Sequence, residues 1–141
     1  MKFNISLHKS ESLSDELDKI TKSVCTLLKV DRASVWIYND VKDKIISSSL
    51  YLLEEDEFQR GAELCRSDFG AYFEAMDTER IIEASDACTH PATACFKDPY
   101  LAPFGIKSMY DIPIWNADKV IGVLCLECLI EKDGWGTDEK G

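Results

Sequence analysis

The chain is poor in the residues that interrupt regular structure, with only seven Gly and four Pro among its 141 residues. Collagen-like and low-complexity chains need far more of both, and the hydrophobic share of 45% is typical of a packed domain. No apolar run approaches the ~18 residues of a membrane-spanning helix, and the first sixteen residues hold no apolar segment of a secretory signal. We therefore expect one compact domain in the cytoplasm.

Positive charge is also scarce. Sixteen Lys and Arg stand against twenty-six Asp and Glu, which gives a net charge of −10. A chain this acidic has no electrostatic footprint for nucleic acid or for an anionic membrane surface, so neither is an expected partner. Only two histidines, His8 and His90, are available for a metal or a haem. Six cysteines in a cytoplasmic chain of this length are expected to be reduced thiols.

The first half of the chain predicts one helix and one hairpin. Apolar residues recur at steps of three and four from Leu13 to Leu28, behind serines that suit an N-cap, which is typical of an amphipathic helix. Residues 33–38 and 44–53 are predicted as paired strands, and Ser47 to Ser49 suggest one polar face. The acidic run 54–57 favours a solvated loop over a metal site, because neighbouring carboxylates repel.

The middle of the chain predicts a short helix and a long connection. Ser67 and Asp68 are placed to cap a helix that runs to about Met76, and Ile81–Ile82 reads as a short strand. Residues 84–103 contain three Pro and scattered small residues, which predicts a loop. Connections this long are uncommon in compact domains unless they serve a function.

The last third predicts a central hairpin from residues 107–114 and 119–129. Alternation along the strands places Met109, Asp111, Val123, Cys125 and Glu127 on one face, against an opposite face of Tyr110, Ile112, Ile114, Leu124, Leu126 and Cys128. Both faces are mostly apolar, so both should be covered. A helix start at Thr137–Glu139 predicts that the chain is a fragment of a longer signalling protein.

These elements resemble the GAF domain family over residues 12–139. The resemblance is carried by the segments ASVWIY (33–38), YFEAM (72–76), YLAPFGIKSM (100–109), DIPI (111–114) and VIGVLCLE (120–127). It implies a single domain over residues 1–141 with an α+β, PAS-related fold. In that fold an antiparallel sheet of five or six strands has terminal helices on one face and a pocket under loops and short helices on the other. It also implies a sensory module ahead of a cyclase, phosphodiesterase, kinase or transcription regulator.

If the terminal helices cover one face, a small-molecule ligand would meet side chains of the other. The candidate ligand-binding residues are then Met109, Asp111, Cys125 and Glu127 from the sheet, with Phe69, Tyr72, Phe96 and Tyr100 from the cover. Plain core packing is the alternative for each of them. Glu127 is the preferred contact for a cationic or hydrogen-bond-donating ligand, whereas Asp111 is expected to anchor backbone amides of the loop.

The known ligands of the family leave the cofactor unknown. The chain lacks the Asn-Lys-Phe-Asp-Glu motif of cyclic-nucleotide binding members, and Cys95 is followed by Phe96 where bilin-binding members carry a Cys-His pair. Cys125 and Cys128 lie three apart in a predicted strand, so their sulfurs point to opposite faces and cannot share a metal. The sequence therefore carries no bilin, haem or metal signature.

We expect a regulatory sensor that binds a small molecule, dimerises through its terminal helices, or does both, and that has no catalytic residue of its own. One alternative is an enzyme resembling the free methionine sulfoxide reductases, which would use Cys88 and Cys95. The Gly-x-Cys-Gly motif of those enzymes is missing, however. A second alternative is a dimerisation module without a ligand.

Overall fold

The computed structural model describes residues 3–4, 13–78 and 80–131. Its helical elements are α1 (Leu13–Leu28), α2 (Gly70–Asp77), the 3₁₀ turn η1 (Ala94–Phe96), the π-helical turn η2 (Lys97–Leu101) and α3 (Ala102–Phe104). Its strands are β1 (Phe3–Asn4), β2 (Arg32–Tyr38), β3 (Lys44–Leu52), β4 (Glu57–Gln59), β5 (Glu63–Cys65), β6 (Ile82–Ala84), β7 (Ser108–Asn116) and β8 (Lys119–Cys128).

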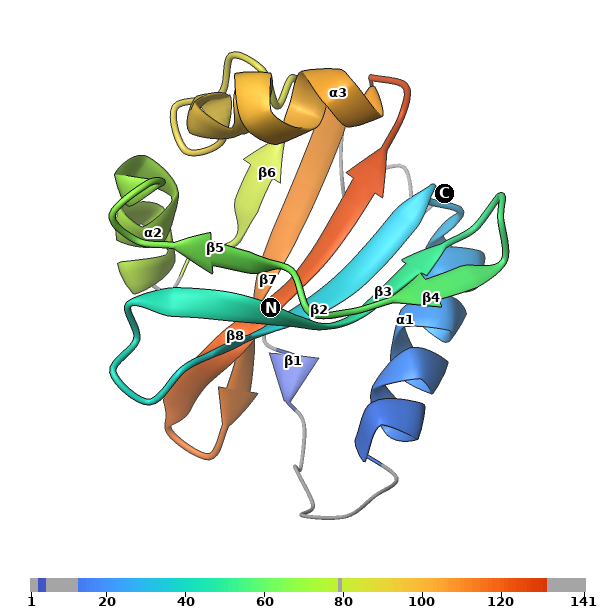
Figure 1. Ribbon diagram of the computed structural model, residues 1–141, viewed down its shortest axis with the longest axis horizontal. Coiled ribbons are helices and arrows are strands. Elements are labelled where there is room, and N and C mark those ends of the chain that lie inside the picture. Colours follow the sequence, from blue (N-terminus) through green and yellow to red (C-terminus); the bar gives the residue numbers. More distant parts are fainter. Residues whose placement is uncertain (1–2, 5–12, 79, 132–141) are drawn as a thin grey trace.

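The strands form one sheet in the order β1-β7-β8-β2-β3-β4, with β5 and β6 as short additions beside β3 and β7 (Figure 1). The described pairings are antiparallel, apart from the parallel pair of β1 and β7. The predicted β7–β8 hairpin takes a central position, flanked by β2 on one side and by β6 and β1 on the other. The α+β fold with a mostly antiparallel sheet is therefore confirmed.

Each face of the sheet has its own hydrophobic core. Helix α1 packs on one face, against β2 and β3. Helix α2 and the segment 85–106, together called the cover below, lie over the other face. In Figure 1 α1 stands at the lower right, whereas α2 and α3 lie at the left and top.

The predicted stripe of α1 is confirmed, since the helix buries Leu17, Thr21 and Cys25. Polar contacts fix it on β3: the Ser49 hydroxyl donates to Asp18 Oδ1 at 2.6 Å and lies 3.0 Å from the Thr21 hydroxyl. Arg60 holds the other oxygen of Asp18 at 2.7 Å. A stripe with polar members can pack here because each buried hydroxyl finds a partner.

A β-bulge in β3 overturns the single polar face expected for Ser47 to Ser49. Val35 pairs with Ser49 while the next residue of β2, Trp36, pairs with Ser47, so Ser48 is an extra residue in β3. The bulge reverses the alternation of the strand. Ile45 consequently joins the core under the cover, whereas Tyr51 joins the core under α1.

The β7–β8 hairpin keeps the predicted alternation. Met109 and Cys125 belong to the core under the cover, while Ile112, Ile114, Leu124, Leu126 and Cys128 belong to the core under α1. The opposite faces predicted for Cys125 and Cys128 are thus confirmed. Two residues, Ala117 and Asp118, connect the paired Asn116 and Lys119, and Ala117 has a φ of 55°. The turn is therefore shorter than the four residues expected from 115–118.

Two expectations about the middle of the chain were wrong in detail. Helix α2 begins at Gly70, and its N-cap residue Phe69 makes no side-chain cap, so neither Ser67 nor Asp68 caps it. Residues 84–103 are not a plain loop, because η1, η2 and the start of α3 make the second half helical. The Pro residues misled the prediction: Pro103 lies in the first turn of α3, where its missing N–H costs nothing. The helix predicted at Thr137 lies outside the described residues.

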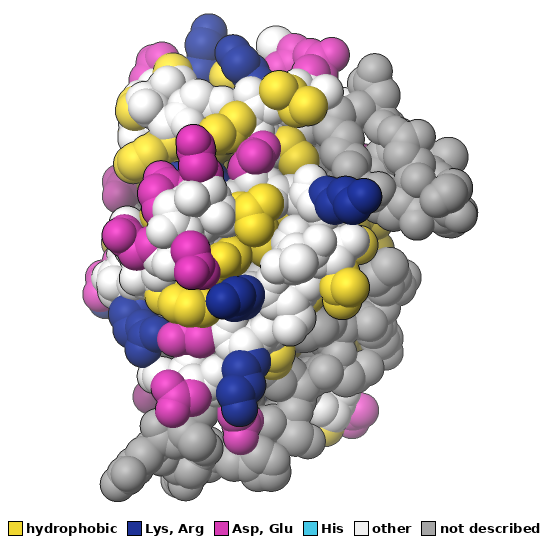
Figure 2. Space-filling view, turned by 90° about the vertical axis from the view of Figure 1, so that its right-hand side faces the viewer, with side chains coloured by type: hydrophobic (Ala, Val, Ile, Leu, Met, Phe, Trp, Pro, Cys, Tyr) yellow, Lys and Arg dark blue, Asp and Glu magenta, His cyan; other side chains and the backbone are white. Residues whose placement is uncertain are grey.

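The surface agrees with the charge of the chain. Over the face that carries α1 and the β3–β4 turn, acidic side chains are spread with lysines and arginines between them (Figure 2). Residues 53–57 form an exposed turn and the start of β4, as expected for the acidic run. Within the described residues, no helix is long and apolar enough to cross a membrane.

Candidate functional site

A small cavity of about 20 Å³ lies between the sheet and the cover. That volume is room for about one water molecule. Ten residues line it: Trp36, Ile45, Leu64, Tyr72, Phe96, Tyr100, Met109, Asp111, Cys125 and Glu127. All the residues predicted as ligand contacts are in this lining except Phe69. Their convergence on one cavity follows from the strand alternation, and their part in binding a ligand stays a prediction.

Phe69 stands one layer behind the cavity wall. Its ring packs on that of Phe96, with 4.7 Å between the ring centroids, and Phe96 itself lines the cavity. Sequence reasoning placed Phe69 in the cavity because it assigned the residue to the first turn of the helix. In the structure Phe69 is only the N-cap residue.

Three apolar lining residues were missed by the sequence analysis, namely Trp36, Ile45 and Leu64. The bulge in β3 hides the face of Ile45, because simple alternation cannot place it and Tyr51 on different faces. Leu64 belongs to β5, a strand of three residues that gives no periodic signal. Trp36 pairs with Val123, which lies two residues before Cys125 and on the same face of β8. Knowledge of the β2–β8 pairing would therefore have placed Trp36 on the cavity face.

Glu127 lines the cavity and forms an ion pair. Arg32 Nε donates to Glu127 Oε1 at 2.9 Å, and the Tyr100 hydroxyl lies 2.9 and 2.8 Å from the two carboxylate oxygens. Arg32 Nη2 in turn reaches the Tyr100 hydroxyl at 3.1 Å. The carboxylate is almost fully buried, with 2% of its side chain exposed against 12% for Arg32. Glu127 therefore already has its counterion.

Arg32 is the charged residue that the sequence analysis missed. It is the first residue of β2 and the register partner of Glu127 on β8. Its guanidinium also lies over two rings of the cover, at 5.7 Å from the centroid of Tyr100 and 5.1 Å from that of Phe104. Such cation–π contacts add to the ion pair. The available signal was its position directly before the predicted strand 33–38.

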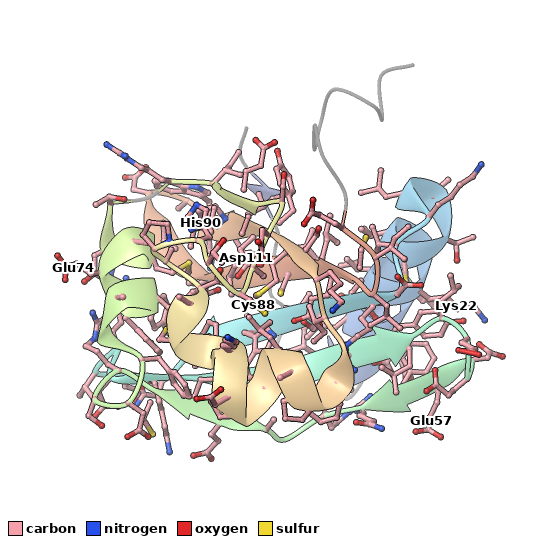
Figure 3. All side chains as sticks on the ribbon, turned by 90° about the horizontal axis from the view of Figure 1, so that it is seen from above. Lys22, Glu57, Glu74, Cys88, His90 and Asp111 are labelled. Atoms are coloured by element: carbon pink, nitrogen blue, oxygen red, sulfur yellow. The ribbon has the colours of Figure 1, made fainter. Side chains whose placement is uncertain are left out.

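Asp111 is the second carboxylate of the cavity, and no Lys, Arg or His of the described ranges forms a salt bridge with it. The Tyr72 hydroxyl of α2 donates to Asp111 Oδ2, whereas Asp111 Oδ1 accepts no hydrogen bond from the described residues. The residue is fully buried. Burial raises the pKa of Asp111 to about 7, against the lowering effects of the Cys125 thiol and the Tyr72 hydroxyl. Figure 3 shows Asp111 in the interior beneath the helical cover, with Glu74 pointing outward from α2.

The three weakly acidic donors of the cavity stay protonated. Burial, together with the Asp111 carboxylate, raises the pKa of Tyr72 well above its usual value. Burial and Glu127 do the same for the pKa of Tyr100, and burial, Asp111 and Glu127 for the pKa of Cys125. The Cys125 thiol donates to Glu127 Oε2 at 3.5 Å. These groups therefore act as hydrogen-bond donors to the carboxylates.

The structure gives both carboxylates partners that the sequence analysis did not predict, while their role toward a ligand stays a prediction. Glu127, expected to meet a ligand, is paired with Arg32 and tied to the cover through Tyr100. Asp111, expected to bind backbone amides of the loop, binds the side chain of Tyr72 and keeps one oxygen without a partner. The partner of Glu127 was not predicted because Arg32 reaches it only through the pairing of β2 with β8.

Two cysteines, Cys88 and Cys95, lie in the cover. Cys88 and Cys95 are half-buried, and burial raises the pKa of Cys95, the opposite of what a nucleophilic thiol needs. His90 accepts a hydrogen bond from the Ala92 amide through Nδ1 at 3.0 Å. Across the described part of the chain, no three His, Cys, Asp or Glu side chains are arranged to hold a metal ion.

Solved structures share this fold at low sequence identity. The GAF domain of Thermosynechococcus elongatus PixJ, in its blue-light absorbing form, is 19% identical with a TM-score of 0.73, over 94% of this chain and 80% of that one. The GAF domain of a two-component sensor histidine kinase from Bacillus halodurans is 22% identical with a TM-score of 0.67, over 89% and 82%.

A third similar structure is the GAF domain of an Acinetobacter phosphoenolpyruvate-protein phosphotransferase. It is 22% identical with a TM-score of 0.66, over 89% of this chain and 71% of that one. No curated protein matches the chain significantly. The family model of the GAF domain matches residues 12–140. With nearly the whole chain matched and the fold shared, the chain belongs to the GAF domain family.

Proposed function

We propose that this GAF domain is a regulatory sensor that binds a small molecule under the cover and so controls an attached output domain. The observation that carries the proposal is that each buried carboxylate of the sheet is tied to a different part of the cover. Asp111 binds Tyr72 of α2, and Glu127 binds Tyr100 of η2. The cavity between these two ties has room for about one water molecule. A larger ligand therefore has to displace the cover at one tie.

A displacement of the cover at Tyr100 would be transmitted to other elements of the domain through hydrogen bonds. The Tyr100 hydroxyl contacts both Glu127 and Arg32, and Arg32 begins strand β2. The preceding residue, Asp31, accepts a hydrogen bond from the Leu129 amide at 2.7 Å, directly after β8 ends. Asp31 also follows Val30, whose amide binds the last turn of α1. A movement of the cover would thus reach both the end of α1 and the chain beyond β8.

The relatives support an output domain as the receiver of this movement. Similar GAF domains belong to a sensor histidine kinase and to a phosphotransferase. We propose the same kind of arrangement here, with this domain as one part of a longer signalling protein and with no catalysis of its own. The raised pKa of Cys95 weighs against the reductase alternative, because that chemistry requires a thiolate.

Dimerisation is a second candidate role, favoured by exposed apolar side chains. Leu27 near the end of α1 is 78% exposed, and Ile130 just after β8 is 74% exposed. A homodimer through the terminal helices would cover such side chains and would couple two cavities. Sedimentation at several concentrations tests this role, and a monomer at all of them would contradict it.

Native mass spectrometry of freshly purified protein tests the sensor proposal. We expect a species heavier than the bare chain by the mass of a small molecule, which is released on denaturation. Cys125→Val fills the cavity and should abolish this species, whereas Cys128→Val makes the same change on the opposite face of β8 and should retain it. Equal retention in the two variants, or only the bare chain in the wild type, would contradict the proposal.

A further inference from the structure

One carboxylate oxygen of the cavity wall, Asp111 Oδ1, is buried without a hydrogen-bond donor from the described residues. Asp111 is fully buried and lines the cavity, and its Oδ1 accepts no hydrogen bond from the described residues. Buried carboxylate oxygens nearly always have a partner in folded proteins. A side chain in this state is expected where the missing partner comes from outside the chain.

The donors of the cavity wall are already engaged elsewhere. The single proton of the Tyr72 hydroxyl goes to Asp111 Oδ2, and that of Tyr100 goes to Glu127. The Cys125 thiol donates its one proton to Glu127 Oε2, although it lies near enough to Asp111 to lower the pKa of that carboxyl. The guanidinium of Arg32 is held by Glu127 and Tyr100. None of the ten lining residues is a Lys, Arg or His. Above pH 7, where Asp111 is ionised, the wall therefore offers an acceptor at Asp111 and no spare donor.

The other walls of the cavity are aromatic. Phe96 meets Tyr72 at 4.9 Å and Tyr100 at 6.4 Å between ring centroids, and Trp36 lines the same space. Flat rings pack well between such walls. Two buried carboxylates and a chain charge of −10 disfavour an anion, since Arg32, the cation that the described residues place beside the cavity lining, is neutralised by Glu127.

We infer that the cavity selects a small planar aromatic molecule that carries an N–H group and donates it to Asp111 Oδ1. This inference rests on the proposed sensor function and specifies its ligand. The cover moves outward at Tyr100 so that the ring lies among Tyr72, Phe96 and Trp36, and the amino group takes the space that has room for about one water molecule. Anionic aromatic molecules are rejected, and so are aromatic hydrocarbons of the same shape, because they leave Asp111 unpaired.

The test compares three probes of similar size, namely aniline, toluene and benzoate, by titration into ¹⁵N-labelled protein. We expect aniline to shift the amides of β7 and α2 around Asp111 and Tyr72, with an affinity about tenfold or more above that of toluene. Benzoate should leave these amides unchanged. Asp111→Asn leaves one acceptor oxygen, which the Tyr72 hydroxyl engages, and turns an NH2 group toward the cavity. This change should weaken aniline by a similar factor and leave toluene unaffected, whereas Glu74→Gln on the outer face of α2 should change neither.

The outcomes separate this inference from the sensor proposal. Equal binding of aniline and toluene in the cavity, no effect of Asp111→Asn, or tighter binding of benzoate would overturn the ligand class while the cavity remained a binding site. Absence of shifts with all three probes would overturn it as well. If native mass spectrometry then also gave only the bare chain, the sensor function itself would fall. The probe comparison in the wild type decides the matter even if Asp111→Asn does not fold.

Discussion

Arg32 and Glu127 are register partners on β2 and β8, and their side chains form a buried ion pair with 2.9 Å between Nε and Oε1. Breaking a buried pair leaves an uncompensated charge, so Arg32→Met should lower the free energy of unfolding by about 3 kcal/mol. Chemical denaturation of Arg32→Met, Glu127→Gln and the double variant measures the coupling between the two residues. We expect a coupling energy of about 2 kcal/mol.

The exposed pair Lys44–Glu63 is the control for this cycle. Its Nζ–Oε1 distance of 3.0 Å is similar, but its side chains are 33% and 49% exposed. Lys44→Met with Glu63→Gln should give a coupling energy below about 1 kcal/mol. Comparable coupling in the two cycles would mean that burial contributes nothing special to the Arg32–Glu127 pair.

Asp111 should make stability depend on pH. Burial raises the pKa of its carboxyl from 3.8 to about 7, so the folded protein holds this proton more tightly than the unfolded chain does. Below about pH 4 the carboxyl is protonated in both states and does not lower the free energy of unfolding. As the pH rises from there through 7, the unfolded chain releases the proton more readily than the folded protein, so the free energy of unfolding falls. Relative to Asp111→Asn, the wild type should lose up to about 4 kcal/mol between these pH values. Denaturation curves of both proteins from pH 4 to 8 measure it, and parallel pH profiles would rule it out.

Gly122 is required where β8 passes β2. A Cβ atom at this position would lie 2.0 Å from the carbonyl oxygen of Trp36, a backbone atom that cannot turn away. Gly122→Ala should therefore destabilise the protein by about 3 kcal/mol. A Cβ at Gly70, in the first turn of α2, would meet nothing within 4 Å, so Gly70→Ala is the matched control and should be neutral or slightly stabilising. Similar melting temperatures for the two variants would refute the steric argument.

The half-buried cysteines of the cover should be dispensable. Replacing Cys88 and Cys95 together with Ser should leave the circular dichroism spectrum and the melting temperature close to those of the wild type. The wild type should not turn over free methionine sulfoxide with a thiol reductant, since burial raises the pKa of Cys95 and keeps its thiol protonated. Turnover that the double variant abolishes would restore the reductase alternative.

Periodicity was enough to predict the helix of residues 13–28, the central hairpin and the face on which Met109, Asp111, Cys125 and Glu127 meet. Those features depend on local alternation, which the sequence displays directly. The contacts between the carboxylates and their partners could not be predicted from the sequence. Arg32 and Glu127 are 95 residues apart, and only strand pairing brings them together. The helical cover was hidden by its Pro residues, and α2 lacked the serine cap that the sequence suggested.

The extra residue Ser48 in β3 also decides how residues can be compared between relatives. On its two sides the strand is out of phase, so Ile45 lies under the cover while Ser49 and Tyr51 lie toward α1. An alignment that runs without a gap from a bulge-free strand would therefore assign half of β3 to the wrong side of the sheet. Any ligand contact carried from a relative onto this strand is transferable only after a one-residue gap at Ser48 has been tried.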